Sequence, residues 1–185
     1  MRNKIIDALK YPFSTKDKVV FDANVLVSLF SGLEPPGSTP MRKYSRVLKE
    51  IKEAGAQMLL DVLVMSEFIN VCVRKNYSLA TAQGGAWESL KRFRQSALFP
   101  PIASDIARTA RQIVALCTPI DHPFSQWGIT DLLDEYAIGQ SDFNDQLIVE
   151  LCRRESALLL TDDTDFTQGG ITVLTTHPKL LASCP

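Results

Sequence analysis

The segment KVVFDANVLVSLF, residues 18–30, places one carboxylate, Asp22, between two apolar runs. The residues before the acid are β-branched or aromatic, which is typical of a buried strand, and residues 24–30 continue with a helical pattern. A strand that passes directly into a helix predicts a crossover to a parallel neighbour, because the chain has to return over the sheet before it pairs again. Asp22 is therefore predicted at the carboxyl end of a strand in a parallel sheet.

The alternation of strand and helix continues along the rest of the chain. The expected strands are residues 19–21, 57–60, 118–120, 157–161 and 171–174. The expected helices are residues 24–30, 41–54, 62–73, 78–95, 102–117, 129–138 and 142–153. The prolines in residues 99–101 are expected to break the chain between two of these helices. This order predicts an α/β fold in which α-helices sandwich a parallel β-sheet.

Length and composition restrict the class of protein. A chain of 185 residues that is 45% hydrophobic can bury one self-supporting core, so a single domain over residues 1–185 is expected. Its 20 basic and 21 acidic residues nearly cancel, so any contact with nucleic acid has to come from a local basic patch. The four cysteines lack metal-ligand spacing, and no run has the length of a signal peptide or a membrane span. A cytoplasmic protein with no membrane association is expected.

Carboxylates recur where a strand ends or where a helix is otherwise apolar. Asp22 ends one strand, and TDDTDF, residues 161–166, ends another; Glu67 and Asp145 interrupt apolar helices. In an open α/β sheet the reacting groups gather beyond the carboxyl ends of the strands. A buried carboxylate is costly without a partner. Lys18 is the only basic residue within five positions of Asp22, and Glu67 has none within six. A shared divalent cation is the predicted partner.

Each acid also has a structural interpretation. Asp22 suits the N-cap of the helix that follows it, and Glu67 can face solvent or pair with a distant arginine. Asp145 lies in the first turn of its helix, where a carboxylate favours the macrodipole, and Asp142 is the expected N-cap. Aspartates are also common turn formers, so some of the three in TDDTDF are expected to be structural. Capping alone does not explain two acids at strand ends together with two on apolar helices.

These segments resemble the PIN-domain ribonucleases over residues 18–174. VVFDANVLV resembles the family's first strand and acid, LVMSEFINV its second-acid helix, and DFNDQLIVELCRRESALLLTDDTDF its third and fourth acids. The resemblance implies a catalytic, metal-binding quartet, one additional metal ligand and two polar residues that orient the cluster. By position these are Asp22, Glu67, Asp145 and Asp163 for the quartet, Asp165 for the additional ligand, and Asn24 and Thr161 for the orienting residues. Residues 78–140 are longer than in compact toxin members and are interpreted as a helical insertion.

The resemblance implies a metal-dependent endoribonuclease. Mg²⁺ or Mn²⁺ is the expected cofactor, because both ions prefer oxygen ligands and activate water for attack on a phosphodiester. The leading interpretation of the cellular role is the toxin of a toxin–antitoxin pair, with RNA processing and RNA decay as the family's other roles. The expected partners are an RNA substrate, an antitoxin protein and a second copy of the chain in a homodimer.

Two other classes of protein stay open. FDANV resembles the strand-end nucleophile of haloacid-dehalogenase-type phosphoryl transfer, but that pattern has a second Asp where Asn24 stands. The other class is a non-catalytic PIN-fold module that binds RNA or a protein. Divalent-dependent cleavage of RNA, compared between the wild type and Asp22→Asn, separates these interpretations.

Three short basic segments are candidate contacts for RNA phosphates. They are residues 74–75, KRFR at residues 91–94, and residues 153–154. A charge run is more often a solvated helix face, and Phe93 inside KRFR is expected in the core. His122 and His177 stand beside prolines and are expected in turns, without a role as general bases.

Overall fold

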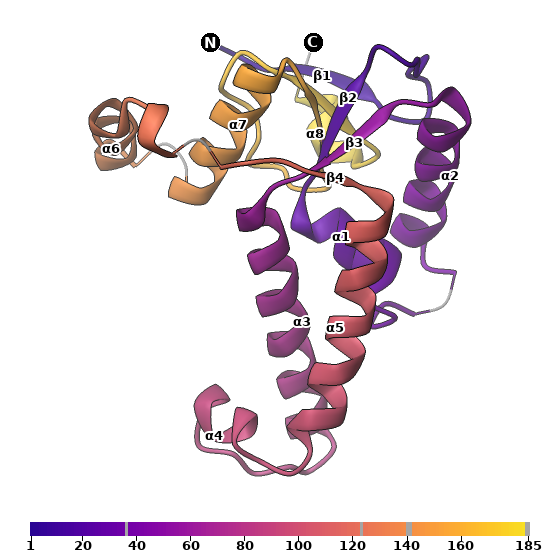
Figure 1. The fold of residues 1–185 in the computed structure, drawn as a ribbon, viewed down its shortest axis with the longest axis vertical. Helices are drawn as coiled ribbons and strands as arrows, with labels where there is room; N and C mark the ends of the chain where they lie inside the picture. The colour runs from indigo at the N-terminus through magenta and orange to yellow at the C-terminus, as the bar shows by residue number, and fades with distance from the viewer. Residues whose placement is uncertain (36, 123, 140–141, 184–185) are drawn as a thin grey trace.

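The computed structural model describes residues 1–35, 37–122, 124–139 and 142–183, and they form an α/β fold around one parallel sheet. The strands run in the order β1-β6-β5-β2-β3-β4 (Figure 1), and every named pair is parallel. They are β1 (Lys4–Asp7), β2 (Lys18–Phe21), β3 (Gln57–Leu60), β4 (Thr118–Pro119), β5 (Leu158–Leu160) and β6 (Thr172–Thr175). The predicted fold class is confirmed.

The helices lie on both faces of the sheet. They are α1 (Ala23–Phe30), α2 (Thr39–Ala54), α3 (Val62–Ala82), α4 (Leu90–Arg94), α5 (Phe99–Leu116), α6 (Ile129–Ala137), α7 (Phe143–Glu155) and α8 (Pro178–Ala182), with a 3-10 turn at Phe124–Gln126. From β2 the chain crosses to β3 and then to β4, in one direction along the sheet, and from β4 it crosses back to β5 in the other direction. Because each crossover is right-handed, α7 lies on the face of the sheet opposite α1, α2, α3 and α5. The packing agrees: α1 contacts α2 and α3, α3 contacts α5, and α7 contacts β5. Figure 1 shows α7 and α2 on opposite sides of the strands.

The predicted helix over residues 78–95 is wrong. α3 continues through Ala82, and the chain then turns at Gly84, whose φ of 95° is a conformation that glycine adopts without the clash of a Cβ. Ser89 caps the short α4 by accepting a hydrogen bond from Arg92 N–H. The expected break at residues 99–101 is also wrong, because α5 begins at Phe99 and carries its prolines in the first turn, where a helix needs no N–H donor.

Two elements near the ends of the chain are absent from the prediction. β1 pairs with β6, with Ile5 opposite Val173 and Ile6 opposite Leu174, so the sheet has one more strand than expected. The short α8 follows β6 and contacts β1. Among the described helices, none is both long enough and apolar enough to cross a membrane.

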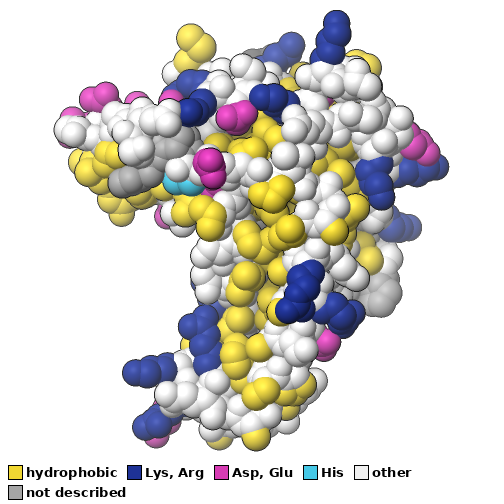
Figure 2. Space-filling view, viewed as in Figure 1, with side chains coloured by type: hydrophobic (Ala, Val, Ile, Leu, Met, Phe, Trp, Pro, Cys, Tyr) yellow, Lys and Arg dark blue, Asp and Glu magenta, His cyan; other side chains and the backbone are white. Residues whose placement is uncertain are grey.

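α3, α4 and α5 form an arm that extends away from the sheet (Figure 1). Phe93 is fully buried at its tip, where its ring lies 5.5 Å from Tyr77, 5.0 Å from Trp87 and 5.7 Å from Phe99, measured between centroids. The expectation that Phe93 belongs to a core is confirmed. Figure 2 shows Lys and Arg side chains at the tip and a band of apolar side chains along α3 and α5.

Candidate active site

The carboxyl ends of two neighbouring strands bring Asp22 and Thr161 together. β2 and β5 pair in parallel up to Phe21 opposite Leu160, so the next residues of both strands lie side by side. Thr161 Oγ1 donates a hydrogen bond of 2.6 Å to Asp22 Oδ2, and both side chains are buried. Asp22 occupies the N-cap position of α1, but its side chain makes no capping hydrogen bond. The carboxylate is therefore committed to the sheet edge and not to the helix end.

Asn24 and Thr161 hold the turn that follows β5. Thr161 Oγ1 accepts a hydrogen bond from the backbone N–H of Asp163 at 2.9 Å, and Asn24 Oδ1 accepts one from Asp162 N–H at 3.2 Å. The Asn24 amide also lies 3.5 Å from the same Thr161 hydroxyl. These contacts put both residues beside Asp22 and fix where the Asp163 backbone stands relative to it.

The structure brings together the four acids of the predicted quartet. Glu67 on α3 and Asp145 in the first turn of α7 reach the same space as the two acids at the strand ends. Asp22, Glu67, Asp145 and Asp163 line one cavity of about 370 Å³, which we call the acidic cavity. Asn24 also lines it, whereas neither predicted turn histidine does.

Burial and the charges of neighbouring carboxylates raise the pKa values of Asp22, Glu67 and Asp145. Burial, then the charges of Glu67 and Asp163, raise the pKa of Asp22 to about 6, against the hydrogen bond from Thr161. Burial, followed by Asp163 as the first of four carboxylates, raises the pKa of Asp145 to about 7. The pKa of Glu67 is raised by burial, although Arg74 opposes this shift. The acidic cavity therefore favours bound protons or a bound cation.

The donor set of the acidic cavity fits a hard divalent cation in its chemistry. Carboxylate oxygens are the ligands that Mg²⁺ and Mn²⁺ prefer, and the lining of the cavity includes six carboxylates, among them the four of the quartet, and one lysine. Over the part of the chain that the structure describes, no three His, Cys, Asp or Glu side chains are already arranged to hold a metal ion. An ion would therefore need these carboxylates to close around it.

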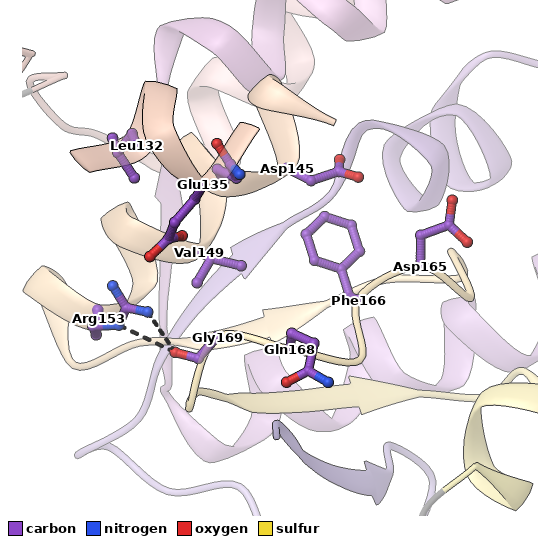
Figure 3. A pocket seen from close by; sticks show the side chains of 10 residues that line it. Leu132, Glu135, Asp145, Val149, Arg153, Asp165, Phe166, Gln168 and Gly169 are labelled. Carbon is purple, nitrogen blue, oxygen red and sulfur yellow. Dashed lines mark hydrogen bonds between the residues drawn. The ribbon is translucent and has the colours of Figure 1, made fainter. Parts of the chain in front are cut away.

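The three acids of TDDTDF lie in different surroundings. Asp163 Oδ1 accepts a hydrogen bond from Asp165 N–H at 2.9 Å while its side chain lines the acidic cavity. Asp162 also borders this cavity, but its Oδ1 accepts a hydrogen bond of 2.8 Å from the buried Tyr44 hydroxyl. Asp165 instead lines a neighbouring cavity of about 80 Å³. Figure 3 shows Asp165, Asp145 and the Phe166 ring together at one end of that smaller cavity, with Arg153 at the other.

Asp61 is a buried acid that the sequence analysis does not select. Asp61 follows β3, is 1% exposed, and caps α3 by accepting a hydrogen bond from Leu63 N–H at 2.7 Å. Its other oxygen, Oδ2, lies 2.8 Å from His122 Nδ1, and the His122 ring packs edge-on against Trp127. The signal was available, since LLDVLV repeats the strand–acid–helix order of VVFDANV.

Lys75, one of the candidate phosphate contacts, is among the residues that line the acidic cavity, where its Nζ lies 2.6 Å from Glu34 Oε1. Of the other candidates, Arg153 is committed to structural contacts. It donates two hydrogen bonds to the Gly169 carbonyl, at 3.1 and 2.7 Å, and pairs with Glu150.

The comparison with protein families agrees with this site. A family model described as PIN domain matches residues 19–170, a span that includes all four acids of the predicted quartet. No curated protein has a sequence that matches the chain.

Proposed function

The chain belongs to the PIN-domain family, and on that premise we propose that it is a divalent-metal-dependent endoribonuclease. PIN domains are generally nucleases, and nucleases of this family typically use divalent metals. The observation that carries the proposal is the acidic cavity, where Asp22, Glu67, Asp145 and Asp163 meet at the carboxyl edge of the sheet. The same four residues are the proposed ligands and catalytic groups.

The proposed chemistry divides between the cofactor and the chain. When bound, Mg²⁺ or Mn²⁺ supplies an acidified water and neutralises charge on the leaving oxygen of a phosphodiester. The chain supplies the four carboxylates, and the raised pKa values of Asp22, Glu67 and Asp145 make a cation a better partner than solvent for these three. Thr161 fixes the Asp22 carboxylate by its hydrogen bond, and Asn24 holds the turn that carries Asp163.

The two alternative classes are less well supported. Asn24 stands where haloacid-dehalogenase-type phosphotransferases have a second Asp, and its side chain bonds the Asp162 backbone instead. A non-catalytic binding module has no need of one buried and three half-buried carboxylates that share a cavity and repel one another, because such a cluster lowers stability without a cation.

The proposed cellular role is that of a toxin in the cytoplasm, paired with an antitoxin protein. A second copy of the chain is a further proposed partner. Support for a homodimer comes from exposed apolar side chains on α3 and α5, which include Ile69, Leu79 and Val114. They belong to helices along which Figure 2 shows the apolar band, and exposed apolar patches commonly mark protein interfaces.

The test is cleavage of mixed-sequence single-stranded RNA with Mn²⁺, with Mg²⁺ and with EDTA. We expect cleavage with either ion, none with EDTA, and a loss of at least about 100-fold in rate for Asp22→Asn. Glu53→Gln is the matched control, because it removes one carboxylate from the exposed face of α2. Cleavage that persists in EDTA, or an Asp22→Asn protein as active as the control, would contradict the proposal.

A further inference from the structure

Lys75 is the one basic residue among the described residues that line the acidic cavity. It lies on the same face of α3 as Glu67, because residues 67, 71 and 75 follow one another at intervals of four and all line this cavity. The helical rise separates Glu67 from Lys75 by about 12 Å along α3. The ammonium group is thus placed at the rim of the cavity, away from the proposed metal ligands.

The partner of Lys75 comes from a different part of the chain. Glu34 lies between α1 and α2, also lines the acidic cavity, and stands with its Oε1 2.6 Å from Lys75 Nζ. The two side chains are 40% and 26% exposed, so solvent screens the pair and it contributes little to folding stability. Both groups therefore remain able to exchange this contact for another.

We propose that Lys75 binds an RNA phosphate beside the one that is cleaved, and that Glu34 holds the Lys75 ammonium at the rim until RNA displaces it. The inference rests on the proposed function. A polyanion that enters a cavity lined by six carboxylates meets repulsion, and a cation at the rim offsets it. A lysine ammonium suits this role, because it is a compact point charge with three donors that rotate to meet a phosphate oxygen.

The proposal predicts opposite effects for the two partners. Lys75→Gln removes the phosphate contact and should raise KM for single-stranded RNA about tenfold while kcat changes little. Glu34→Gln removes the competitor of the phosphate and should lower KM. Lys75→Arg keeps the charge and should stay close to the wild type. A merely structural ion pair would instead move both variants in the same direction.

Salt dependence supplies an independent readout. Each phosphate contact on a single strand adds about 0.7 to the slope of log affinity against log salt, so Lys75→Gln should lower that slope by about this amount. Lys49→Gln and Glu53→Gln are the matched controls, because this exposed pair on α2 joins the same residue types at 3.6 Å outside the acidic cavity. Both controls should leave KM unchanged, and melting temperatures should show that all variants fold.

The experiment separates failure of this inference from failure of the proposed function. If the wild type cleaves RNA with Mn²⁺ but Lys75→Gln keeps its KM and its salt slope, the role of Lys75 is overturned. If KM shifts the same way for Lys75→Gln and Glu34→Gln, the competition is overturned. If the wild type cleaves no RNA, the proposed function fails, and fluorescence anisotropy with the same RNA then tests whether Lys75 binds RNA. Weaker binding by Lys75→Gln than by the wild type supports that role, and equal binding or no binding overturns it.

Discussion

One hydroxyl group links the two strand ends that carry Asp22 and Asp163. Thr161 Oγ1 donates to Asp22 at the end of β2 and accepts from the Asp163 backbone after β5. The group is fully buried, so water does not compete for either bond. A single side chain thus sets the position of one predicted ligand relative to another, although the two acids are far apart in sequence.

The surroundings of the TDDTDF acids predict an order of importance for cleavage. Asp163 lines the acidic cavity, Asp165 lines the neighbouring cavity, and one oxygen of Asp162 is bound by the Tyr44 hydroxyl. Asp163→Ala should therefore reduce Mn²⁺-dependent cleavage most, Asp165→Ala less, and Asp162→Ala least. Asp162→Ala should instead lower the melting temperature, because it leaves the buried Tyr44 hydroxyl without one of its acceptors.

Initial rates at saturating Mn²⁺ give this order, with the melting temperature of each variant as the control for folding. An inactive but stable Asp162→Ala beside an active Asp163→Ala would show that Asp162, and not Asp163, supplies the ligand.

At the scale of elements, α3 serves both the site and the arm. Glu67 near its beginning and Lys75 further along line the acidic cavity, and its last turns support the arm together with α5. The sequence analysis ends this helix at residue 73, because the apolar pattern stops there. The helix continues because residues 74–82, which are less apolar than the turns before them, include no proline or glycine and need only one covered face.

The sequence predicts the elements whose signal is local, and it misses those that depend on distant partners. Strands that an acid follows, such as β2 and β5, show both an apolar run and, after it, a change from the strand pattern of apolar residues to another pattern. β1 has no such signal: KIID becomes a strand because it pairs with β6, more than 160 positions away in sequence. The same limit applies to the contacts of Asp61 with His122 and of Lys75 with Glu34, which no spacing along the chain reveals.

The aromatic cluster around Phe93 predicts a separable unit at the tip of the arm. Phe93→Ala removes the ring that Tyr77, Trp87 and Phe99 contact, and such truncations of buried aromatics cost about 3–5 kcal/mol. We expect amide protons of residues 83–98 to lose protection from hydrogen exchange, while Mn²⁺-dependent cleavage of short RNA stays close to wild type.

Leu98→Ala is the matched control for this variant, since Leu98 is 46% exposed near the same tip and its truncation should change neither measurement. Loss of protection across the sheet strands in Phe93→Ala would show that the arm and the sheet unfold as one unit.

At the scale of the whole molecule, the near-neutral net charge hides a local concentration of carboxylates. The chain is nearly neutral, with 20 basic and 21 acidic residues, yet the lining of the acidic cavity includes six carboxylates and one lysine. The fold brings them together because β2 and β5 are neighbours and because α3 and α7 approach their carboxyl ends. The sheet order therefore creates the site and also the repulsion within it.

Burial of these carboxyls, together with that repulsion, fixes the sign of the pH dependence of the metal-free protein. The pKa values of Asp22 and Asp145 rise from 3.8 to about 6 and about 7 on folding, so the folded state binds more protons than the unfolded state between about pH 4 and pH 7. The free energy of unfolding therefore falls as pH increases through this window. In EDTA, the melting temperature should be several degrees lower at about pH 8 than at about pH 5.

A bound cation, or the replacement of one carboxylate by a neutral amide, should each restore the free energy of unfolding that is lost at high pH, because each reduces the repulsion between the carboxylates. Mn²⁺ should raise the melting temperature at about pH 8 much more than at about pH 5, because protons occupy the carboxylates at the lower pH. Asp22→Asn should be more stable than the wild type in EDTA at about pH 8 and should gain less from Mn²⁺, since it removes one buried charge and one ligand together. Asp105→Asn, which changes an exposed carboxylate on α5, should follow the wild type in every condition. A metal-free melting temperature that rises between these two pH values, or an Asp22→Asn protein that gains as much from Mn²⁺ as the wild type, would show that these carboxylates neither repel one another nor share an ion.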